Sequence, residues 1–279
     1  MALGPQTYRV ERPFGGLRPA QGSVTDVAVD AGGNVHVLVR RDGLVDGDDK
    51  AVFVFDPAGE PIGAWGDDLV MDAHMLAPGR DGILFVVDRD AHEVILCRDG
   101  RRVGGIGGRH RPNEPFNHPT DVAQAADGTL YVADGYANAR IHRFAPDGAL
   151  LQRWGSQGDG PGQFMTPHAV WVMRDGRVVV ADRENNRLQV FSADGALLDI
   201  WHGFEKPMDI WGDDDDRLYV TDLVPSLTLL SPAGERLGRC RPVLNVAHGI
   251  WGGPDGSLYL AEPNPNRVTK LVPIDASSP

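Results

Sequence analysis

The chain has 279 residues, of which 42% are apolar, and a formal net charge of -12. This acidic balance argues against a nucleic-acid partner, because phosphate contacts require basic patches. No stretch approaches 18 apolar residues and the start has no apolar signal segment, so we expect neither membrane insertion nor secretion. With 35 Gly and 21 Pro for turns, the composition suits one all-β domain over residues 1–279.

Six related segments follow one another along the chain. Their approximate bounds are 24–66, 71–107, 118–155, 166–202, 206–240 and 246–273. In the third segment, short apolar runs alternate with polar residues and are separated by the turns Asp127-Gly128 and Asp147-Gly148. This pattern is typical of an antiparallel meander. One meander cannot bury both of its faces, whereas six stacked meanders can, so the repeat predicts a six-bladed β-propeller.

The sixth segment stops after its third strand, at RVTKLV. Residues 7–15 (TYRVERPFG) precede the first segment and have strand composition. We expect this N-terminal strand to supply the missing fourth strand and to close the ring.

The chain contains two cysteines, Cys97 and Cys240, on strands of different repeats. We therefore expect free, buried thiols, which are typical of a protein in the reducing cytoplasm.

One position at the start of the first strand of each repeat alternates between Asp and His. The residues are Asp26, His74, Asp121, His168, Asp209 and His248, spaced 48, 47, 47, 41 and 39 residues apart. Equivalent positions of a propeller lie on a ring, so three histidines would face one another about 120° apart. Three imidazoles with an open position form the catalytic zinc arrangement, although iron, manganese or cobalt fit the same donors. We therefore predict a metal site and prefer it to structural histidines.

The three aspartates of this position have two interpretations. They could accept hydrogen bonds from the imidazole N–H groups, or they could be structural residues of the repeat, which is the interpretation we favour.

The second strand of a meander ends on the face where the first begins, so the residues that follow it should surround the histidines. Arg40, Arg41, Arg89, Tyr136 and Arg183 occupy such positions. This rim predicts a small anionic substrate, with Arg40 and Arg89 as candidate binding residues. Arginines that begin the third strands are instead predicted to be scaffold: Arg140, Arg187 and Arg267.

The segments PTDVAQAADGTLYVADGYANARIHRF and ADRENNRLQVF resemble NHL repeats, which form six-bladed propellers. Together with FNHPTDVA, and with GPGQF followed by PHAV, they resemble the family of peptidyl-α-hydroxyglycine α-amidating lyases. The resemblance implies zinc held by His74, His168 and His248, and Tyr136 as the base. It also implicates Arg183 and Arg41, with Arg40 as the alternative to Arg41. The implied reaction splits a carbinolamide into an amide and glyoxylate.

The chain departs from the family at several positions. Asn117, Ala137, Val179 and Val190 stand where animal members have disulfide cysteines, and Gly249 replaces the aspartate of a structural calcium site. The resemblance therefore extends to zinc but not to calcium. No hydroxylating domain is fused to the repeats, so the expected substrate is a small α-hydroxy acid metabolite rather than a peptide hormone precursor.

Two other functions are compatible with a propeller. A metal-dependent hydrolase such as a lactonase would use a channel metal, but with a carboxylate-rich calcium shell. A non-catalytic NHL interaction module would need no metal. The sequence does not identify protein partners.

Overall fold

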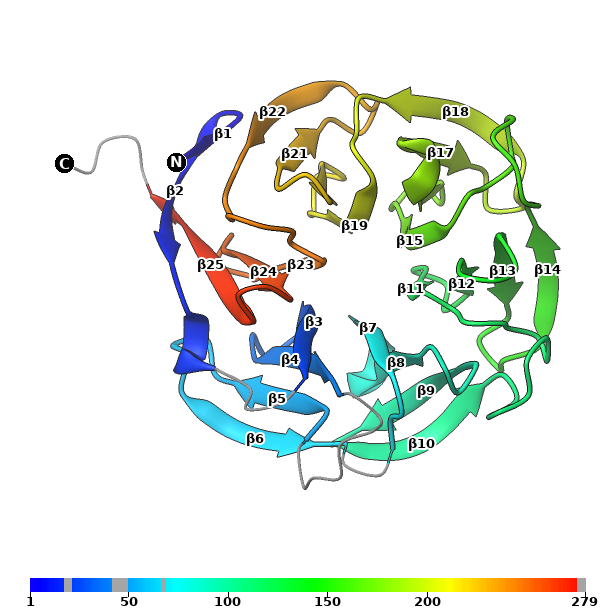
Figure 1. Ribbon diagram of the computed structural model, residues 1–279, viewed down its shortest axis with the longest axis horizontal. Coiled ribbons are helices and arrows are strands. Elements are labelled where there is room, and N and C mark those ends of the chain that lie inside the picture. The colour runs from blue at the N-terminus through cyan, green and yellow to red at the C-terminus, as the bar shows by residue number, and fades with distance from the viewer. Residues whose placement is uncertain (18–21, 42–49, 67–68, 275–279) are drawn as a thin grey trace.

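The computed structural model describes residues 1–17, 22–41, 50–66 and 69–274. Within these ranges the strands form six antiparallel sheets, which are arranged in a ring around one axis (Figure 1). The predicted six-bladed propeller is therefore confirmed. We number the blades 1 to 6 in chain order, with the first strand of each blade nearest the axis.

Blades 1 to 3 are regular four-stranded meanders. Blade 1 contains β3 (Ser23–Val29), β4 (Val35–Arg40), β5 (Val52–Phe55) and β6 (Pro61–Trp65). Blade 2 contains β7 (Ala73–Pro78), β8 (Leu84–Asp88), β9 (Glu93–Arg98) and β10 (Arg101–Ile106). Blade 3 contains β11 (Asp121–Gln124), β12 (Leu130–Asp134), β13 (Arg140–Phe144) and β14 (Leu150–Trp154).

Blades 4 and 5 repeat this arrangement, and blade 6 differs. Blade 4 contains β15 (Pro167–Val172), β16 (Val178–Asp182), β17 (Arg187–Phe191) and β18 (Leu197–His202). Blade 5 contains β19 (Pro207–Gly212), β20 (Leu218–Asp222), β21 (Leu227–Leu230) and β22 (Arg236–Cys240). Blade 6 contains β23 (Gly249–Gly252), β24 (Leu258–Glu262) and β25 (Arg267–Ile274) from the end of the chain.

An N-terminal strand completes blade 6 and closes the ring, as predicted. β2 (Gln6–Glu11) pairs with β25, from Thr7 opposite Ile274 to Glu11 opposite Lys270. The strand is shorter than the expected range 7–15, because Pro13 has no N–H group with which to continue the ladder. A 3-10 turn, η1 (Phe14–Gly16), follows it. The two-residue strand β1 (Ala2–Leu3), which the sequence did not indicate, adds a fifth strand.

Asp-Gly turns separate the strands where the sequence predicted them. Between β11 and β12, Asp127 Oδ1 accepts a hydrogen bond from Thr129 N at 2.9 Å. The next residue, Gly128, has a φ of 91°, which glycine adopts without strain. Two further 3-10 turns are η2 (Arg80–Gly82) and η3 (Arg183–Asn185).

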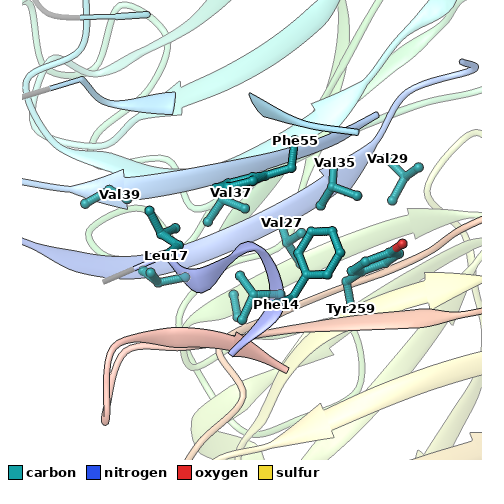
Figure 2. Close-up of a cluster of buried hydrophobic side chains, with 12 residues drawn as sticks. Phe14, Leu17, Val27, Val29, Val35, Val37, Val39, Phe55 and Tyr259 are labelled. Atoms are coloured by element: carbon teal, nitrogen blue, oxygen red, sulfur yellow. The ribbon is translucent and has the colours of Figure 1, made fainter. Parts of the chain in front are cut away.

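The apolar core consists of clusters between neighbouring blades. Figure 2 shows the cluster between blades 1 and 6, where Val27 and Val37 pack with Phe14 and Tyr259. Because both faces of a blade are covered, second strands such as β12 are buried along their whole length. Burying one Val or Leu side chain contributes about 1.5–3 kcal/mol. The outermost strands, such as β14, are mostly exposed.

Both cysteines are free thiols. Cys97 is buried, whereas Cys240 is half-buried rather than buried, because it ends the outermost strand of blade 5. Among the described residues, no helix has the length and apolar composition needed to cross a lipid bilayer.

Candidate metal centre

Three histidines from alternate blades converge on the axis of the propeller. His74 lies in β7, His168 lies in β15, and His248 directly precedes β23. The pairing of β7 with β8 and that of β15 with β16 shift register at the histidine. Such bulges re-aim side chains. All three ring centroids are 5.0 Å apart, and one nitrogen of each ring lies within 4.8 Å of the others.

A backbone carbonyl group fixes the orientation of each imidazole. Nδ1 of His74 lies 2.6 Å from Thr120 O, and Nδ1 of His168 lies 2.6 Å from Met208 O. Nδ1 of His248 lies 2.9 Å from Thr25 O. A carbonyl oxygen can only accept, so each Nδ1 carries the proton and each Nε2 keeps its lone pair.

The three imidazoles are buried in a way that keeps them neutral. His74 and His168 are fully buried, and His248 is 9% exposed. Burial lowers the pKa of His74 and of His168 well below the usual value, and lowers that of His248 to about 4. Neutral Nε2 atoms that point at one another are suitable ligands for a transition metal ion. The donor set therefore fits the predicted metal.

The aspartates of the alternating position connect neighbouring blades, whereas the histidines converge on the axis. Their Oδ2 atoms accept hydrogen bonds from the backbone N–H two residues after each histidine: Asp26 from Leu76, Asp121 from Val170 and Asp209 from Ile250, at 2.7–2.8 Å. Each aspartate thus links an odd blade to the next even blade. The interpretation as imidazole acceptors is wrong, since carbonyl groups take that role, and the structural interpretation fits.

Gly249, next to His248, lies against one of these aspartates. A Cβ at position 249 would lie 1.9 Å from Asp26 Oδ1. The Asp26 carboxylate therefore occupies the space that a side chain at position 249 would need.

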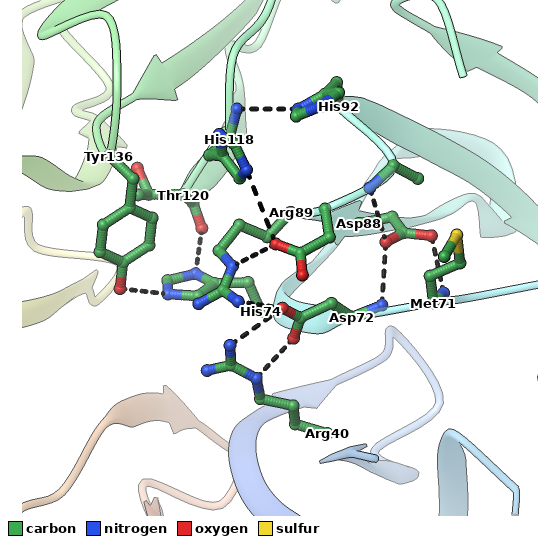
Figure 3. Close-up of polar contacts among 12 residues, drawn as sticks. Arg40, Met71, Asp72, His74, Asp88, Arg89, His92, His118, Thr120 and Tyr136 are labelled. Carbon is green, nitrogen blue, oxygen red and sulfur yellow. Dashed lines mark hydrogen bonds and ion pairs between the residues drawn. The ribbon is translucent and has the colours of Figure 1, made fainter. Parts of the chain in front are cut away.

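Tyr136 reaches the histidines from blade 3. Its hydroxyl lies 2.9 Å from His74 Nε2 and 3.3 Å from His168 Nε2 (Figure 3 shows the contact with His74). The Tyr136 ring lies between two guanidinium groups, with Arg89 Cζ at 5.5 Å and Arg183 Cζ at 5.4 Å from its centroid. Arg183 Nη1 also lies 3.4 Å from the hydroxyl. The structure thus brings Tyr136, Arg183 and Arg89 together beside the histidines.

Arg40 and Arg41 differ in their surroundings. Arg40 Nη2 donates to Asp72 Oδ2 at 2.9 Å, and its positive charge contributes to lowering the pKa of His74 and His248. Arg41 donates to the carbonyl oxygen of Val70 at 3.3 Å. Arg40 is thus one of the charges that act on the histidines.

The repeat contains a signal for Arg40 that the sequence analysis did not use. The last residue of the second strand is a buried carboxylate in the other five blades: Asp88, Asp134, Asp182, Asp222 and Glu262. Asp88 and Asp182, for example, accept hydrogen bonds from backbone N–H groups just before the first strand of their own blade. In blade 1 the equivalent position is Val39, because Val24 pairs with Val39 as Pro207 pairs with Asp222 in blade 5. Arg40 follows directly, at the position that Arg89 occupies in blade 2 and Arg183 in blade 4, so the repeat aligns these three arginines.

Two of the three predicted scaffold arginines, Arg187 and Arg267, are held by contacts within the repeat. Arg187 is buried, donates to Asp182 Oδ2 at 2.8 Å and binds two carbonyl groups of the preceding loop. Arg267 pairs with Glu262 in the same way.

A cavity of about 740 Å³ opens beside His248 at the face where the first strands begin. Its lining includes Arg40, Arg41, Asp72 and Arg89. Asp72, which lies two residues before His74, was not predicted from the sequence. It is paired with both Arg40 and Arg89 (Figure 3).

The fold and the site together define an NHL-repeat six-bladed propeller with a buried three-histidine cluster. The family described as NHL repeat matches residues 116–144 and 164–191. Over nearly its whole length, the chain is similar to peptidyl-glycine alpha-amidating monooxygenase A of Xenopus laevis. The two are 31% identical, and the match covers 94% of this chain and 33% of that protein. It is also 33% identical to a probable peptidyl-alpha-hydroxyglycine alpha-amidating lyase of Caenorhabditis elegans, over 57% of this chain and 48% of that protein.

The resemblance to amidating lyases is thus confirmed, at modest identity. The chain spans about a third of the length of the amidating monooxygenases that it matches. Solved structures share the fold at low identity. A streptogramin B lyase has a TM-score of 0.71 and 14% identity, covering 96% of this chain and 98% of that one. A gluconolactonase of Xanthomonas campestris has a TM-score of 0.72 and 16% identity, covering 98% and 99%. These neighbours support the propeller fold alone.

Proposed function

We propose that the protein is a metal-dependent carbon–nitrogen lyase that cleaves an α-hydroxyglycine-type carbinolamide. One observation carries this proposal: the Tyr136 hydroxyl lies between the Nε2 atoms of His74 and His168, with the Arg183 guanidinium beside it. A base next to a three-imidazole cluster suits removal of a proton from a hydroxyl group. The similarity to amidating lyases supports the same reaction.

The reaction needs no water. The substrate R–CO–NH–CH(OH)–COO⁻ gives R–CO–NH₂ and OHC–COO⁻: the hydroxyl proton leaves, a C=O bond forms, the C–N bond breaks and the nitrogen gains a proton. A zinc ion held by His74, His168 and His248 would supply Lewis acidity that makes the hydroxyl more acidic. Iron, manganese or cobalt would suit the same ligands.

The chain's own residues hold and move the proton. Tyr136 accepts the hydroxyl proton and returns one to the departing nitrogen. Arg183, beside the phenol oxygen, holds the substrate carboxylate with its planar fork and stabilises negative charge on the phenol. Arg40 adds positive charge near His74 and His248 and, with Arg41 in the same cavity lining, favours an anionic substrate.

Metal analysis and a glyoxylate assay test the proposal together. The purified protein should contain about one transition metal ion per chain and release glyoxylate and benzamide in equal amounts from α-hydroxyhippurate. His168→Ala should lose the metal and the activity, because two imidazoles hold the ion poorly. His202→Ala, an exposed control, should keep both. Full metal occupancy in the His168 variant, or lactone hydrolysis without glyoxylate release, would contradict the proposal.

A further inference from the structure

One side of the cavity beside the histidines is formed by charged residues. We call Arg40, Asp72, Arg89 and Asp90 the charged wall; all four line the cavity. Arg40 Nη2 donates to Asp72 Oδ2 at 2.9 Å, and Arg89 Nε donates to Asp90 Oδ1 at 2.9 Å. Arg89 also pairs with Asp72, so the four side chains form one chain of alternating charges (Figure 3 shows Arg40, Asp72 and Arg89).

Asp72 is the member of the charged wall that has no counterpart in blades 4 and 6. The residue two positions before the histidine is Asp72 in blade 2, but Thr166 in blade 4 and Val246 in blade 6. The pair of Arg89 and Asp90 does recur in blade 4, as Arg183 and Glu184, whereas the acid between the two guanidinium groups does not. An asymmetric feature at a symmetric centre is not required by the scaffold, and it is suited to distinguish the two ends of a bound molecule.

The wall has unused hydrogen-bonding capacity of both kinds. The Asp90 side chain is 46% exposed, so its carboxylate can accept hydrogen bonds from a ligand, whereas Asp72 Oδ1 is buried against Arg40 Nε. Each guanidinium has five N–H donors, of which the wall's own pairs use only some. A ligand that both donates and accepts hydrogen bonds therefore matches the wall.

An apolar ligand group does not match it. Placing an aryl or alkyl group against the wall would remove water from the ion pairs without replacing its hydrogen bonds, which costs free energy. A primary amide or ureido group avoids this cost, because its N–H groups face carboxylates and its carbonyl oxygen faces a guanidinium. Of the described residues that line the cavity, Met71 and Pro263 are the large apolar ones.

We propose that the charged wall binds the nitrogen-bearing half of the substrate, and that this half is a small polar amide, with a ureido group as the best match. This inference rests on the proposed function. The substrate N-carbamoyl-α-hydroxyglycine would lose its hydroxyl proton, break its C–N bond and give glyoxylate and urea. The balance needs no oxidant, reductant or water.

A substrate pair tests the inference. The protein is assayed for glyoxylate release from N-carbamoyl-α-hydroxyglycine and from N-benzoyl-α-hydroxyglycine. We expect kcat/KM to favour the carbamoyl compound by at least about tenfold, since sites built to hydrogen-bond a group discriminate strongly against analogues that lack it. Faster release from the benzoyl compound would overturn this inference alone. Glyoxylate from neither compound would overturn the proposed function and the inference with it.

A binding measurement examines the wall without turnover. N-carbamoylglycine and N-benzoylglycine lack the α-hydroxyl group, so they are not cleaved, and calorimetry gives their affinities directly. Asp90→Asn should weaken binding of the carbamoyl compound by about tenfold or more, because a hydrogen bond to a charged group is lost, and should change that of the benzoyl compound little. Asp214→Asn, in the exposed turn between β19 and β20, is the matched control and should change neither. Equal effects of Asp90→Asn on both ligands would overturn the role of the wall.

Discussion

In each imidazole of the cluster, one hydrogen bond determines which ring nitrogen carries the proton and which carries the lone pair. Because Nδ1 of His74, His168 and His248 faces a carbonyl group, the lone pair of each ring is on Nε2. Tyr136 places its hydroxyl at two of these lone pairs and can donate to only one at a time. The chemistry of the site therefore depends on individual atoms of four side chains.

The phenol oxygen of Tyr136 can be removed with little change of shape. Tyr136→Phe should keep the metal and the fold but lose on the order of 10²- to 10⁴-fold in turnover, the usual contribution of a general base. The measurement is kcat for glyoxylate release as a function of pH, together with metal content. Turnover near that of the wild type, with the same basic limb of the pH profile, would remove Tyr136 from the mechanism.

Two arginines of blade 4 have different roles: Arg183 belongs to the candidate site, and Arg187 belongs to the scaffold. Arg183→Lys keeps the charge but replaces a planar fork by a single ammonium group, so it should impair turnover or substrate binding while the fold persists. Arg187→Lys removes hydrogen bonds to Asp182 and to two carbonyl groups, so it should lower the free energy of unfolding more than it changes kcat. Steady-state kinetics and urea unfolding of both variants check this, and equal kinetic losses in two stably folded proteins would contradict it.

The sequence predicted the residues of the site better than their contacts. The positions of the histidines and of Tyr136 follow from the repeat, because equivalent positions lie on one ring. The choice between Arg40 and Arg41 did not follow, since neighbouring residues at a strand end point in opposite directions. The pairing of Asp72 with Arg40 could not be predicted either, because it joins two blades through their loops. The metal itself stays a prediction.

At the level of strands, the first strands of the blades form a continuous ring of hydrogen bonds. Aspartates connect each odd blade to the next even blade, and histidine Nδ1 groups connect each even blade to the next odd blade. The first strand is an edge strand, and its N–H groups would otherwise be unpaired in a buried position. Burial raises the pKa of all three aspartates, that of Asp121 to about 7.

Removing one link of this ring should weaken the fold. Asp209→Ala leaves the buried N–H groups of Ile210 and Ile250 without acceptors, so we expect a loss of about 1–3 kcal/mol in the free energy of unfolding. Urea denaturation measures the loss. Asp159→Ala, at an exposed loop position, should stay within about 0.5 kcal/mol of the wild type. An unchanged midpoint for the Asp209 variant would show that water satisfies these groups.

The sequence predicted that the strands form meanders, but it predicted less well where individual strands begin and end. Alternation and Asp-Gly turns identified the meanders, because both faces of a blade are buried and the turns require glycine. The end of β2 at Glu11 depends on Pro13, and β1 is too short to carry an alternating pattern.

For the molecule as a whole, the pH dependence of stability has opposing contributions. The lowered pKa values of the three histidines make the fold more stable as pH rises, whereas the raised pKa values of buried carboxyl groups act in the other direction. Asp222 is one of these groups: burial raises its pKa to about 6, and its Oδ1 has no hydrogen-bond partner.

The Asp222 contribution can be isolated by substitution. With a folded pKa of about 6 and an ordinary unfolded pKa of about 3.9, its stabilising proton is lost as pH rises through about 6. The free energy of unfolding of Asp222→Asn should therefore rise by about 1 kcal/mol, relative to that of the wild type, between pH 5 and pH 7.5. Urea unfolding of both proteins at the two pH values gives this difference. A constant difference would mean that Asp222 is ionised throughout the range.

The closure of the ring also determines when the site can exist during synthesis. β2 is synthesised before the strands of blade 1, and its partner β25 is the last strand of the propeller to be synthesised, with Thr7 opposite Ile274. His248 likewise belongs to the last blade and is oriented by Thr25 of the first. A nascent chain that has not reached blade 6 therefore carries two of the three histidines and an N-terminal strand with an open edge. Until the last blade emerges, that edge needs protection from other chains, and all three imidazoles can come together only after blade 6 has been synthesised.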